Sequence, residues 1–317
     1  MKTFRFLTTL LLTFNLHLAL AQTPRTAEDY NNRGLERQSK GDLDGAIEDY
    51  SKAISLKAKP STIATAYNNR ANALLSRNEI DGAIADYSKA IEIEPDNFEN
   101  YYNRGVAFMS KNDLDGALAD FSKSLEIFPK FSMAFNNRGN IKKAKGDIDG
   151  AINDYDKAIG FHPKFVEAYY NRGTAYQSKG DGTAAIKDFT VALEMAPSFV
   201  EAYINRAQAR QSQRDLEGAM ADYNQALELK PDAGVYYARA TARQVKEDFS
   251  GALADYSKAI ELNPRLAQAY ANRGVIETLQ GRKAEARQDF ERAFLIDPSL
   301  RATFKKFIEN RLERKTP

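Results

Sequence analysis

A five-residue string that starts with an aromatic residue and closes with Arg-Gly or Arg-Ala occurs eight times in the chain, and all copies but one carry Asn before the Arg. The copies start at Tyr30, Tyr67, Tyr101, Phe135, Tyr169, Tyr203, Tyr236 and Tyr270. Successive starts are 37, 34, 34, 34, 34, 33 and 34 residues apart. A period of this length indicates an array of like supersecondary units, each of which buries its apolar face against its neighbours. The repeat therefore restricts the chain to a stacked, solenoid-like architecture.

Each unit carries the periodicity of two helices. If the first aromatic residue is numbered position 4, then positions 4, 8 and 11 fall on one face of a first helix, and positions 20, 24 and 27 on one face of a second. Position 8 is always Gly or Ala, position 20 is always Ala, position 24 is always aromatic, and position 27 is Ala except at Ser124. The small residues allow the two helices to approach closely. A proline at position 32 of most units, from Pro95 to Pro298, ends the second helix.

On these residues the chain resembles the tetratricopeptide-repeat family from about Ala27 to Leu300. The resemblance implies an all-α fold, a right-handed α-solenoid (superhelix) of eight helix-turn-helix repeats. We expect the repeats to span residues 27–63, 64–97, 98–131, 132–165, 166–199, 200–232, 233–266 and 267–299. A signal peptide at 1–21 and a short linker at 22–26 precede them, and residues 300–317 are expected to form a capping helix and a basic tail.

The segment after the eighth repeat has one apolar face, formed by Leu300, Phe304, Phe307, Ile308 and Leu312, and one basic face. The apolar side of a terminal repeat needs a cover, because no further repeat buries it. A capping helix is the first interpretation of the segment. A basic helix that lies on a membrane surface is the alternative.

Two positions depart from the family pattern in every repeat. Position 7, usually Leu in the family, is Arg (Arg33, Arg70, Arg104, Arg138, Arg172, Arg206, Arg239, Arg273), and position 23 is Asp (Asp49, Asp86, Asp120, Asp154, Asp188, Asp222, Asp255, Asp289). Both positions flank the inward face of their helix. We therefore predict a ladder of partly buried Arg–Asp pairs that join the two helices of each repeat, with Arg138 and Asp154 as the pair of the fourth repeat. The alternative is that the arginines bind an acidic ligand.

Position 11 is irregular. It is often Tyr in the family, but here it is Arg37, Leu74, Phe108, Lys142, Tyr176, Arg210, Arg243 and Glu277 in turn. The polar and charged members of this series predict poor packing at several joints between helices.

The first 21 residues differ in composition from the repeats. Lys2 and Arg5 precede an apolar stretch, and Ala19-Leu20-Ala21 fits the small-x-small site of signal peptidase. The stretch is short for a membrane span. We therefore expect an exported protein, periplasmic or secreted, that is cleaved after Ala21, with an uncleaved N-terminal anchor as the alternative. No integral membrane span is expected after processing.

Charge and residue content argue against nucleic-acid binding and against catalysis. Loss of residues 1–21 removes two basic residues and leaves 43 of each sign, so the mature chain has no net positive charge to attract nucleic acid. The chain has no Cys, and His162 is the one His that follows the signal peptide. Thiol nucleophiles, thiolate metal sites and paired-His zinc sites are thereby excluded. We expect no enzyme activity, no metal and no cofactor.

A file of asparagines marks the candidate binding surface. Position 6 is Asn in seven repeats (Asn32, Asn69, Asn103, Asn137, Asn171, Asn205, Asn272) and Ala238 in the other, and position 5 adds Tyr102, Tyr170, Ile204 and Tyr237. Position 6 lies about 200° round the helix from positions 4 and 8, and so points away from the second helix. The family would make this side the concave groove. An amide both donates and accepts, and can therefore hold the backbone of an extended peptide.

The sequence thus predicts a protein-interaction scaffold of the cell envelope. In the first reading the asparagine file binds an extended peptide segment, as in the similar asparagine ladder of O-linked N-acetylglucosamine transferase. In the second, each Asn bonds to the neighbouring repeat and fixes the stack, and the chain is an architectural subunit joined through its outer surface or its ends. The expected partner is a protein or peptide, and a homo-oligomer stays open.

Overall fold

The computed structural model describes residues 24–312, so the expected signal peptide lies outside the described residues, as does the end of the basic tail. Within this part the regular structure is helical, without a strand. The helices are α2 (Ala27–Ser39), α3 (Leu43–Ser55), α4 (Pro60–Ser76), α5 (Ile80–Ile93), α6 (Phe98–Ser110), α7 (Leu114–Ile127), α8 (Ser132–Ala144), α9 (Ile148–Phe161), α10 (Val166–Lys179), α11 (Gly182–Met195), α12 (Val200–Ser212), α13 (Leu216–Leu229), α14 (Ala233–Val245), α15 (Phe249–Leu262), α16 (Ala267–Leu279), α17 (Lys283–Ile296) and α18 (Leu300–Arg311).

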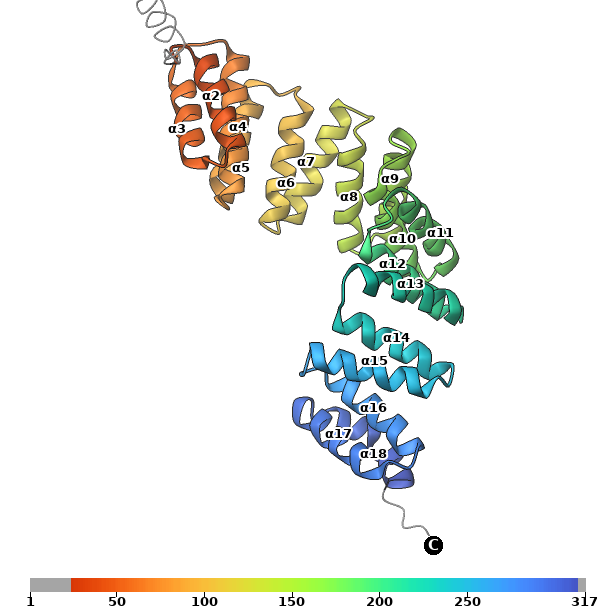
Figure 1. The fold of residues 1–317 in the computed structure, drawn as a ribbon. Coiled ribbons are helices and arrows are strands. Elements are labelled where there is room, and N and C mark those ends of the chain that lie inside the picture. The colour runs from red at the N-terminus through yellow and green to blue at the C-terminus, as the bar shows by residue number, and fades with distance from the viewer. Residues whose placement is uncertain (1–23, 313–317) are drawn as a thin grey trace, which may run out of the picture. The chain divides into compact units, whose positions relative to one another are not determined.

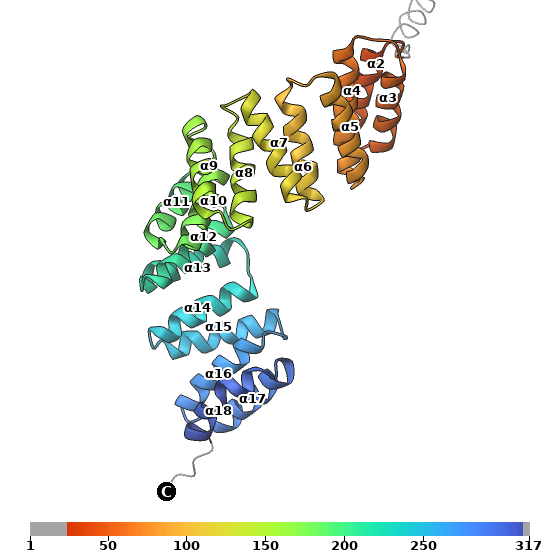
Figure 2. The same ribbon diagram turned by 180° about the vertical axis from the view of Figure 1, so that it is seen from behind.

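The helices pair as helix A and helix B of eight repeats, and they form two compact units divided between Lys142 and Lys143. In the first unit α2 packs on α3, α3 on α4, α4 on α5, and α5 on α6, while α2 also contacts α4 (Figure 1). The second unit repeats this order from α9 to α17, and α10 contacts α12 (Figure 2). Helix A of the same repeat and helix A of the next repeat therefore both pack on α3, α5, α11, α13 and α15. The predicted all-α solenoid of stacked helix pairs is confirmed.

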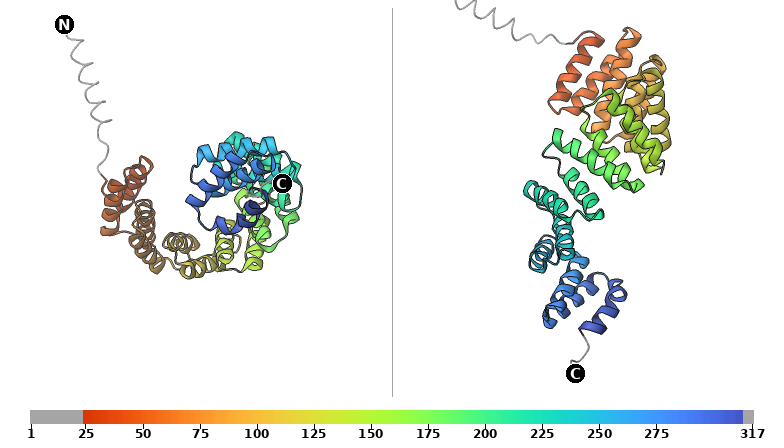
Figure 3. Two further views of the ribbon diagram at one scale, coloured as in Figure 1. Left: turned by 90° about the horizontal axis from the view of Figure 1, so that it is seen from below. Right: turned by 90° about the vertical axis from the view of Figure 1, so that its right-hand side faces the viewer.

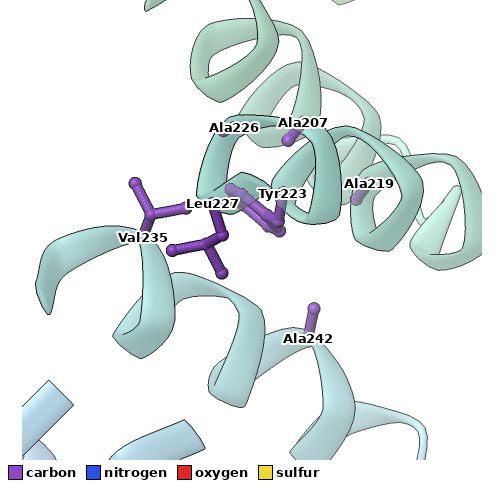
Figure 4. Close-up of a cluster of buried hydrophobic side chains, with 7 residues drawn as sticks. All are labelled: Ala207, Ala219, Tyr223, Ala226, Leu227, Val235 and Ala242. Atoms are coloured by element: carbon purple, nitrogen blue, oxygen red, sulfur yellow. The ribbon is translucent and has the colours of Figure 1, made fainter. Parts of the chain in front are cut away.

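The core is built from the small and aromatic positions of the repeat. In repeat 6, Ala219 at position 20 and Tyr223 at position 24 are both fully buried. The small residue at position 8 is required by contact, since a Cβ on Gly105 would lie 2.8 Å from Cε1 of Phe121. Figure 4 shows how the next repeat closes this core, where Leu227 of α13 faces Val235 of α14.

The eight turns between helix A and helix B share one backbone conformation. Position 15 has a positive φ in every repeat, at Gly41, Asn78, Asn112, Gly146, Gly180, Arg214, Glu247 and Gly281. Gly and Asn adopt this left-handed region readily, whereas Arg214 (φ 64°) and Glu247 (φ 63°) do so at a cost. The repeat therefore imposes the same turn even where the residue does not favour it.

Helix α18 covers the end of the stack, as the capping-helix interpretation expects. Phe304, Phe307 and Ile308 pack on the buried cluster around Phe290 and Phe294 of α17, and Leu312 is buried in it. Helix α18 contacts both α16 and α17 at the blue end of the chain (Figure 3, right). It thus takes the place of a ninth helix A, but with Ile308 where each repeat has Gly or Ala at position 8. Ile308 packs instead on the apolar cluster of repeat 8.

We predict that replacing Arg214 by Gly stabilises the protein. The substitution removes the left-handed strain of a residue with a Cβ, and should raise the free energy of unfolding by about 0.5–1 kcal/mol. Thermal or urea unfolding measures the change. Arg214→Ala is the matched control, because it removes the same side chain without relieving the strain. An equal gain in both variants would contradict the argument.

Candidate functional site

In seven repeats the Arg at position 7 donates two parallel hydrogen bonds to the Asp at position 23. In repeat 6, Arg206 Nε donates to Asp222 Oδ2 at 2.9 Å and Nη2 donates to Oδ1 at 2.6 Å, and Asp222 is 2 % exposed. The same two-pronged contact joins Arg33 to Asp49, Arg70 to Asp86, Arg104 to Asp120, Arg172 to Asp188, Arg239 to Asp255 and Arg273 to Asp289. The predicted ladder is confirmed in these seven repeats. Arg138 and Asp154 fall on opposite sides of the division between the units, and their pairing stays a prediction.

The same guanidinium also reaches the preceding repeat. Arg206 Nη1 donates to Thr190 Oγ1 at 3.0 Å, and Thr190 is position 25 of repeat 5. Equivalent bonds run from Arg70 to Ser51, Arg104 to Ser88, Arg138 to Ser122, Arg172 to Asp156, Arg239 to Asn224 and Arg273 to Ser257. The sequence analysis missed this contact. The signal was present, because position 25 carries Ser, Thr, Asn or Asp in each of the first seven repeats.

The aromatic ring at position 4 completes the surroundings of each Arg. The guanidinium carbon lies 5.4–5.8 Å from the centre of that ring in all eight repeats, within cation–π range. The hydrogen-bonded Asp86 carboxylate raises the pKa of Arg70 above its ordinary value, against the opposing effect of burial. From repeat 2 onward the arginines are thus held by the ring at position 4 and by the preceding repeat, and the alternative in which they bind an acidic ligand gains no support.

The expectation of poor packing at position 11 was wrong in the repeats with Arg there. Arg37, Arg210 and Arg243 each place Nη1 2.8–3.2 Å from the position-23 carboxylate of their repeat, which therefore receives two guanidinium groups. Nη1 also donates to the backbone carbonyl of position 19, for example Gly218 in repeat 6. The guanidinium group therefore has hydrogen-bond acceptors, while the aliphatic part of the side chain packs between the two helices of the repeat. Leu74 and Phe108 instead contact the small residue at position 19, Gly82 and Gly116.

Repeat 8 is the exception in this series. Its position 11 is Glu277, which is 6 % exposed and lies beside Asp289 rather than neutralising it. Burial, and then the charge of Asp289, raise the pKa of Glu277 to about 7. Repeat 8 therefore contains a buried carboxyl group that changes charge near neutral pH.

The asparagines at position 6 hydrogen-bond to position 5 of the preceding repeat. In the first unit, Asn69 Nδ2 donates to Asn31 (2.9 Å), Asn103 to Asn68 (3.4 Å) and Asn137 to the Tyr102 hydroxyl (3.1 Å). In the second unit, Asn205 donates to the Tyr170 hydroxyl at 2.9 Å and Asn272 to the Tyr237 hydroxyl at 3.1 Å. Asn171 lies half-buried on α10. The structure thus brings most of the predicted site residues together in pairs, one from each of two successive repeats.

The one repeat that lacks Asn at position 6 shows that the two positions act together. Ala238 replaces Asn in repeat 7, and its partner position in repeat 6 is Ile204 rather than Tyr or Asn. Both side chains pack on the same buried cluster, which includes Leu227 and Val235. An apolar pair therefore substitutes for a hydrogen-bonded pair at this joint.

Metal sites, membrane spans and the lone histidine were the remaining candidates in the described residues. Across residues 24–312 no group of three or more His, Cys, Asp or Glu is arranged to hold a metal ion. No helix in the same range combines the length and the apolar character that a membrane span requires. His162 is exposed at the C-cap of α9, where its ring stacks on Phe165.

Stacked pairs of antiparallel helices, joined repeat by repeat, define an α-solenoid of the kind that serves as a protein-interaction scaffold. Models described as "TPR repeat" match residues 71–111 and 139–180, and models described as "Tetratricopeptide repeat" match 28–60, 99–131, 166–199, 200–232 and 237–299. These matches cover most of the chain. The chain belongs to the tetratricopeptide-repeat family.

Solved structures agree with this fold. A tetratricopeptide repeat protein from Parabacteroides merdae is 20 % identical with a TM-score of 0.58, covering 84 % of this chain and 98 % of that one. The C-terminal part of a repeat protein from Cytophaga hutchinsonii is 19 % identical with a TM-score of 0.60, covering 75 % and 97 %. YrrB, described as a TPR protein with an unusual peptide-binding site, is 24 % identical with a TM-score of 0.52, covering 63 % and 99 %. A search of the curated proteins found no match.

We predict strong energetic coupling between Arg206 and Asp222. Removal of either partner leaves a charge in a buried position, since their side chains are 13 % and 3 % exposed, and should destabilise the protein by about 2–4 kcal/mol. A double-mutant cycle by urea unfolding measures the coupling. The exposed pair Lys258–Glu261 is the matched control, with an expected coupling of about 0.5 kcal/mol or less. Equal coupling in the two pairs would refute a structural role for the ladder.

The raised pKa of Glu277 predicts that stability falls as pH rises. Between the ordinary pKa of 4.5 and the folded-state value of about 7, the folded chain holds a proton that the unfolded chain has released. Stability therefore decreases across this window, by about 1–3 kcal/mol in all. Glu277→Gln should remove this component, so the difference in unfolding free energy between variant and wild type should grow from pH 5 to pH 8. A constant difference across that range would show that Glu277 titrates normally.

Proposed function

We propose that this chain is an exported protein-interaction scaffold that binds an extended peptide segment along the face lined by the position-6 asparagines. The observation that carries the proposal is that most of these amides are partly buried and donate one hydrogen bond to the preceding repeat. Asn103, Asn205 and Asn272 are half-buried, and each uses one N–H on the preceding repeat. An amide has two N–H groups and a carbonyl oxygen, so this bond leaves Asn103 and Asn205 a donor and an acceptor for a ligand, whereas Asn272 also hydrogen-bonds to Tyr256.

The bond to the preceding repeat makes the amides better binding groups. It fixes the side-chain torsions before a ligand arrives, so less conformational entropy is lost on binding. The backbone of an extended peptide presents alternating N–H and C=O groups, which match such a file without reference to the peptide sequence. The rings of Tyr102, Tyr170 and Tyr237 lie half-buried beside the amides and offer apolar contact to peptide side chains. YrrB, described as a TPR protein with an unusual peptide-binding site, is a precedent for peptide binding on this fold.

Export rests on the sequence of residues 1–21, with the small-x-small site at Ala19-Leu20-Ala21. We place the mature chain in the periplasm or outside the cell. The intact mass of protein recovered from the exporting host tests this step, and a mass that retains residues 1–21 would overturn it.

A second candidate function is supported by the same hydrogen bonds. If the amides serve only to join successive repeats, the chain is an architectural subunit whose partners bind its outer surface or its ends. The pairing of Ile204 with Ala238 favours this reading, because that joint is closed without any amide. The two candidates therefore differ in whether an amide can be removed without loss of a partner.

The chain itself supplies the variant that separates the two candidates. Tyr170→Ile with Asn205→Ala, combined with Tyr237→Ile and Asn272→Ala, copies the apolar Ile204–Ala238 pair at two further joints. The stack should persist because Ala favours helix over Asn and the apolar pair replaces the bond. If the amides bind the ligand, loss of two should weaken partner binding by about 1–3 kcal/mol, which is about five- to a hundredfold. Partners captured from an envelope extract provide the ligand, and circular dichroism checks the fold.

Three outcomes are informative. A folded variant that loses its partners supports peptide binding at the asparagine file. A folded variant that keeps every partner at wild-type affinity places the binding surface elsewhere and rejects the proposal. A variant that melts early makes the amides structural; in that case Tyr170→Phe, which removes the hydroxyl but keeps Asn205, should retain partner binding if the amide itself is the contact.

A further inference from the structure

Repeat 8 reverses a charge pattern that three other repeats share. In repeats 1, 6 and 7, position 11 is Arg and position 16, the N-cap of helix B, is Asp. In repeat 8, position 11 is Glu277 and position 16 is Arg282. The exchange keeps an ion pair between the two positions, since Arg282 Nη1 lies 3.8 Å from Glu277 Oε1. It also removes the second cation from the position-23 carboxylate, which here is Asp289.

The ion pair with Arg282 leaves one oxygen of the Glu277 carboxylate without a hydrogen bond. Glu277 is 6 % exposed, and its Oε2 has no hydrogen bond to any residue in the described part of the chain. Buried carboxylate oxygens in folded proteins are almost always hydrogen-bonded, because an unpaired one destabilises the fold. Oε2 of Glu277 is therefore open to a further donor, in addition to the ion pair that Oε1 makes with Arg282.

A cavity of about 640 Å³ opens at this carboxylate, between α16 and α17. Its wall includes the carboxylates of Glu277, Glu285, Asp289 and Glu291, together with Arg273 and Arg292. Arg273 is already committed, because it donates to Asp289 through Nε and Nη2 and to Ser257 through Nη1. The wall therefore offers more carboxylate than available cation.

We propose that this cavity binds an arginine side chain of a protein partner, whose guanidinium takes the place that the position-11 Arg fills in repeats 1, 6 and 7. In repeat 6 the resident side chain is Arg210, whose Nη1 donates to Asp222 Oδ2 at 2.8 Å. The incoming guanidinium restores this second contact, to Asp289, and satisfies Glu277 as well. A guanidinium has five N–H donors in a planar fork and serves two carboxylates at once, which a compact ammonium does less well.

This inference rests on the proposed function, since it names one side chain by which a protein partner is recognised. It uses residues outside the asparagine file. An experiment can therefore show that the cavity does not bind arginine without contradicting peptide binding along the asparagine file, and the reverse.

A pair of synthetic peptides tests the cavity without knowledge of the partner. The probe is a blocked, rhodamine-labelled peptide with three arginines separated by glycine pairs, and its counterpart carries citrulline, which has nearly the same shape but no charge. Binding to the full mature chain is measured by fluorescence anisotropy at pH 8, where Glu277 is ionised. We expect the arginine peptide to bind about tenfold or more tightly than the citrulline peptide, a difference of about 1.4 kcal/mol.

Variants of the protein test whether the preference for the arginine peptide arises at the cavity. Glu277→Gln should abolish most of it, and Glu277→Arg should abolish it while copying the position-11 residue of repeats 1, 6 and 7. Glu194→Gln, an exposed carboxylate of α11, removes one equal charge elsewhere and should leave the preference intact. If a Glu277 variant unfolds repeat 8, Glu291→Gln at the exposed rim provides the second test, with an expected partial loss.

Two results would overturn the proposal. One is equal binding of the arginine and citrulline peptides. The other is an arginine preference that survives in folded Glu277→Arg, or that falls as much in Glu194→Gln, because either would indicate general attraction to an acidic surface. Capture of native partners by folded Glu277→Arg, alongside loss in the asparagine-file variant, would leave the scaffold function standing and reject the cavity.

Discussion

The stack depends on one side chain per repeat, the Arg at position 7. Its partner, the Asp at position 23, is almost completely buried, and a buried carboxylate is tolerated only when a cation and hydrogen bonds surround it. The two-pronged contact through Nε and Nη2 fixes the plane of the guanidinium, and this plane directs Nη1 to position 25 of the preceding repeat. The pairing of helices within a repeat and the joining of successive repeats are therefore one interaction. Loss of the Arg would therefore leave the buried Asp unpaired and would also remove the bond to the preceding repeat.

The sequence predicts the first half of that interaction but not the second. Arg and Asp recur in phase on flanking positions, so their pairing across two helices follows from helical periodicity alone. The bond from Nη1 to Ser51 or Thr190 depends on how two repeats are placed, which no single repeat specifies. The same limit explains the error at position 11. Comparison with the family marks Arg210 as a misfit, whereas in the structure its guanidinium donates both to the position-19 carbonyl and to the position-23 carboxylate.

The asparagine file shows how reasoning from one helix pair is incomplete. The turn of about 200° from the packed face predicts that position 6 points away from its own helix B. In a stack, however, that direction also approaches helix A of the preceding repeat, and Asn205 meets the Tyr170 hydroxyl there. The substitution of Ile204 together with Ala238 is visible in the sequence. It can be interpreted as an exchange of one contact pair for another only when positions 5 and 6 of successive repeats are known to be in contact.

The departures of repeat 8 follow from its position before α18. In repeats 1 to 7 position 25 is kept polar and small because an Arg of the next repeat binds it. Helix α18 carries Phe307 at the corresponding place, so Glu291 at position 25 has no such Arg to receive. Because no following Arg requires a small polar acceptor at position 25, repeat 8 tolerates Glu277, Arg282 and Glu291 at positions 11, 16 and 25. A stack of like repeats leaves little freedom for new chemistry in its interior, because each polar group there is held by a neighbour. Its terminal repeat retains the fold while one side of its polar network is open, and this is where a charged recognition site costs the stack least.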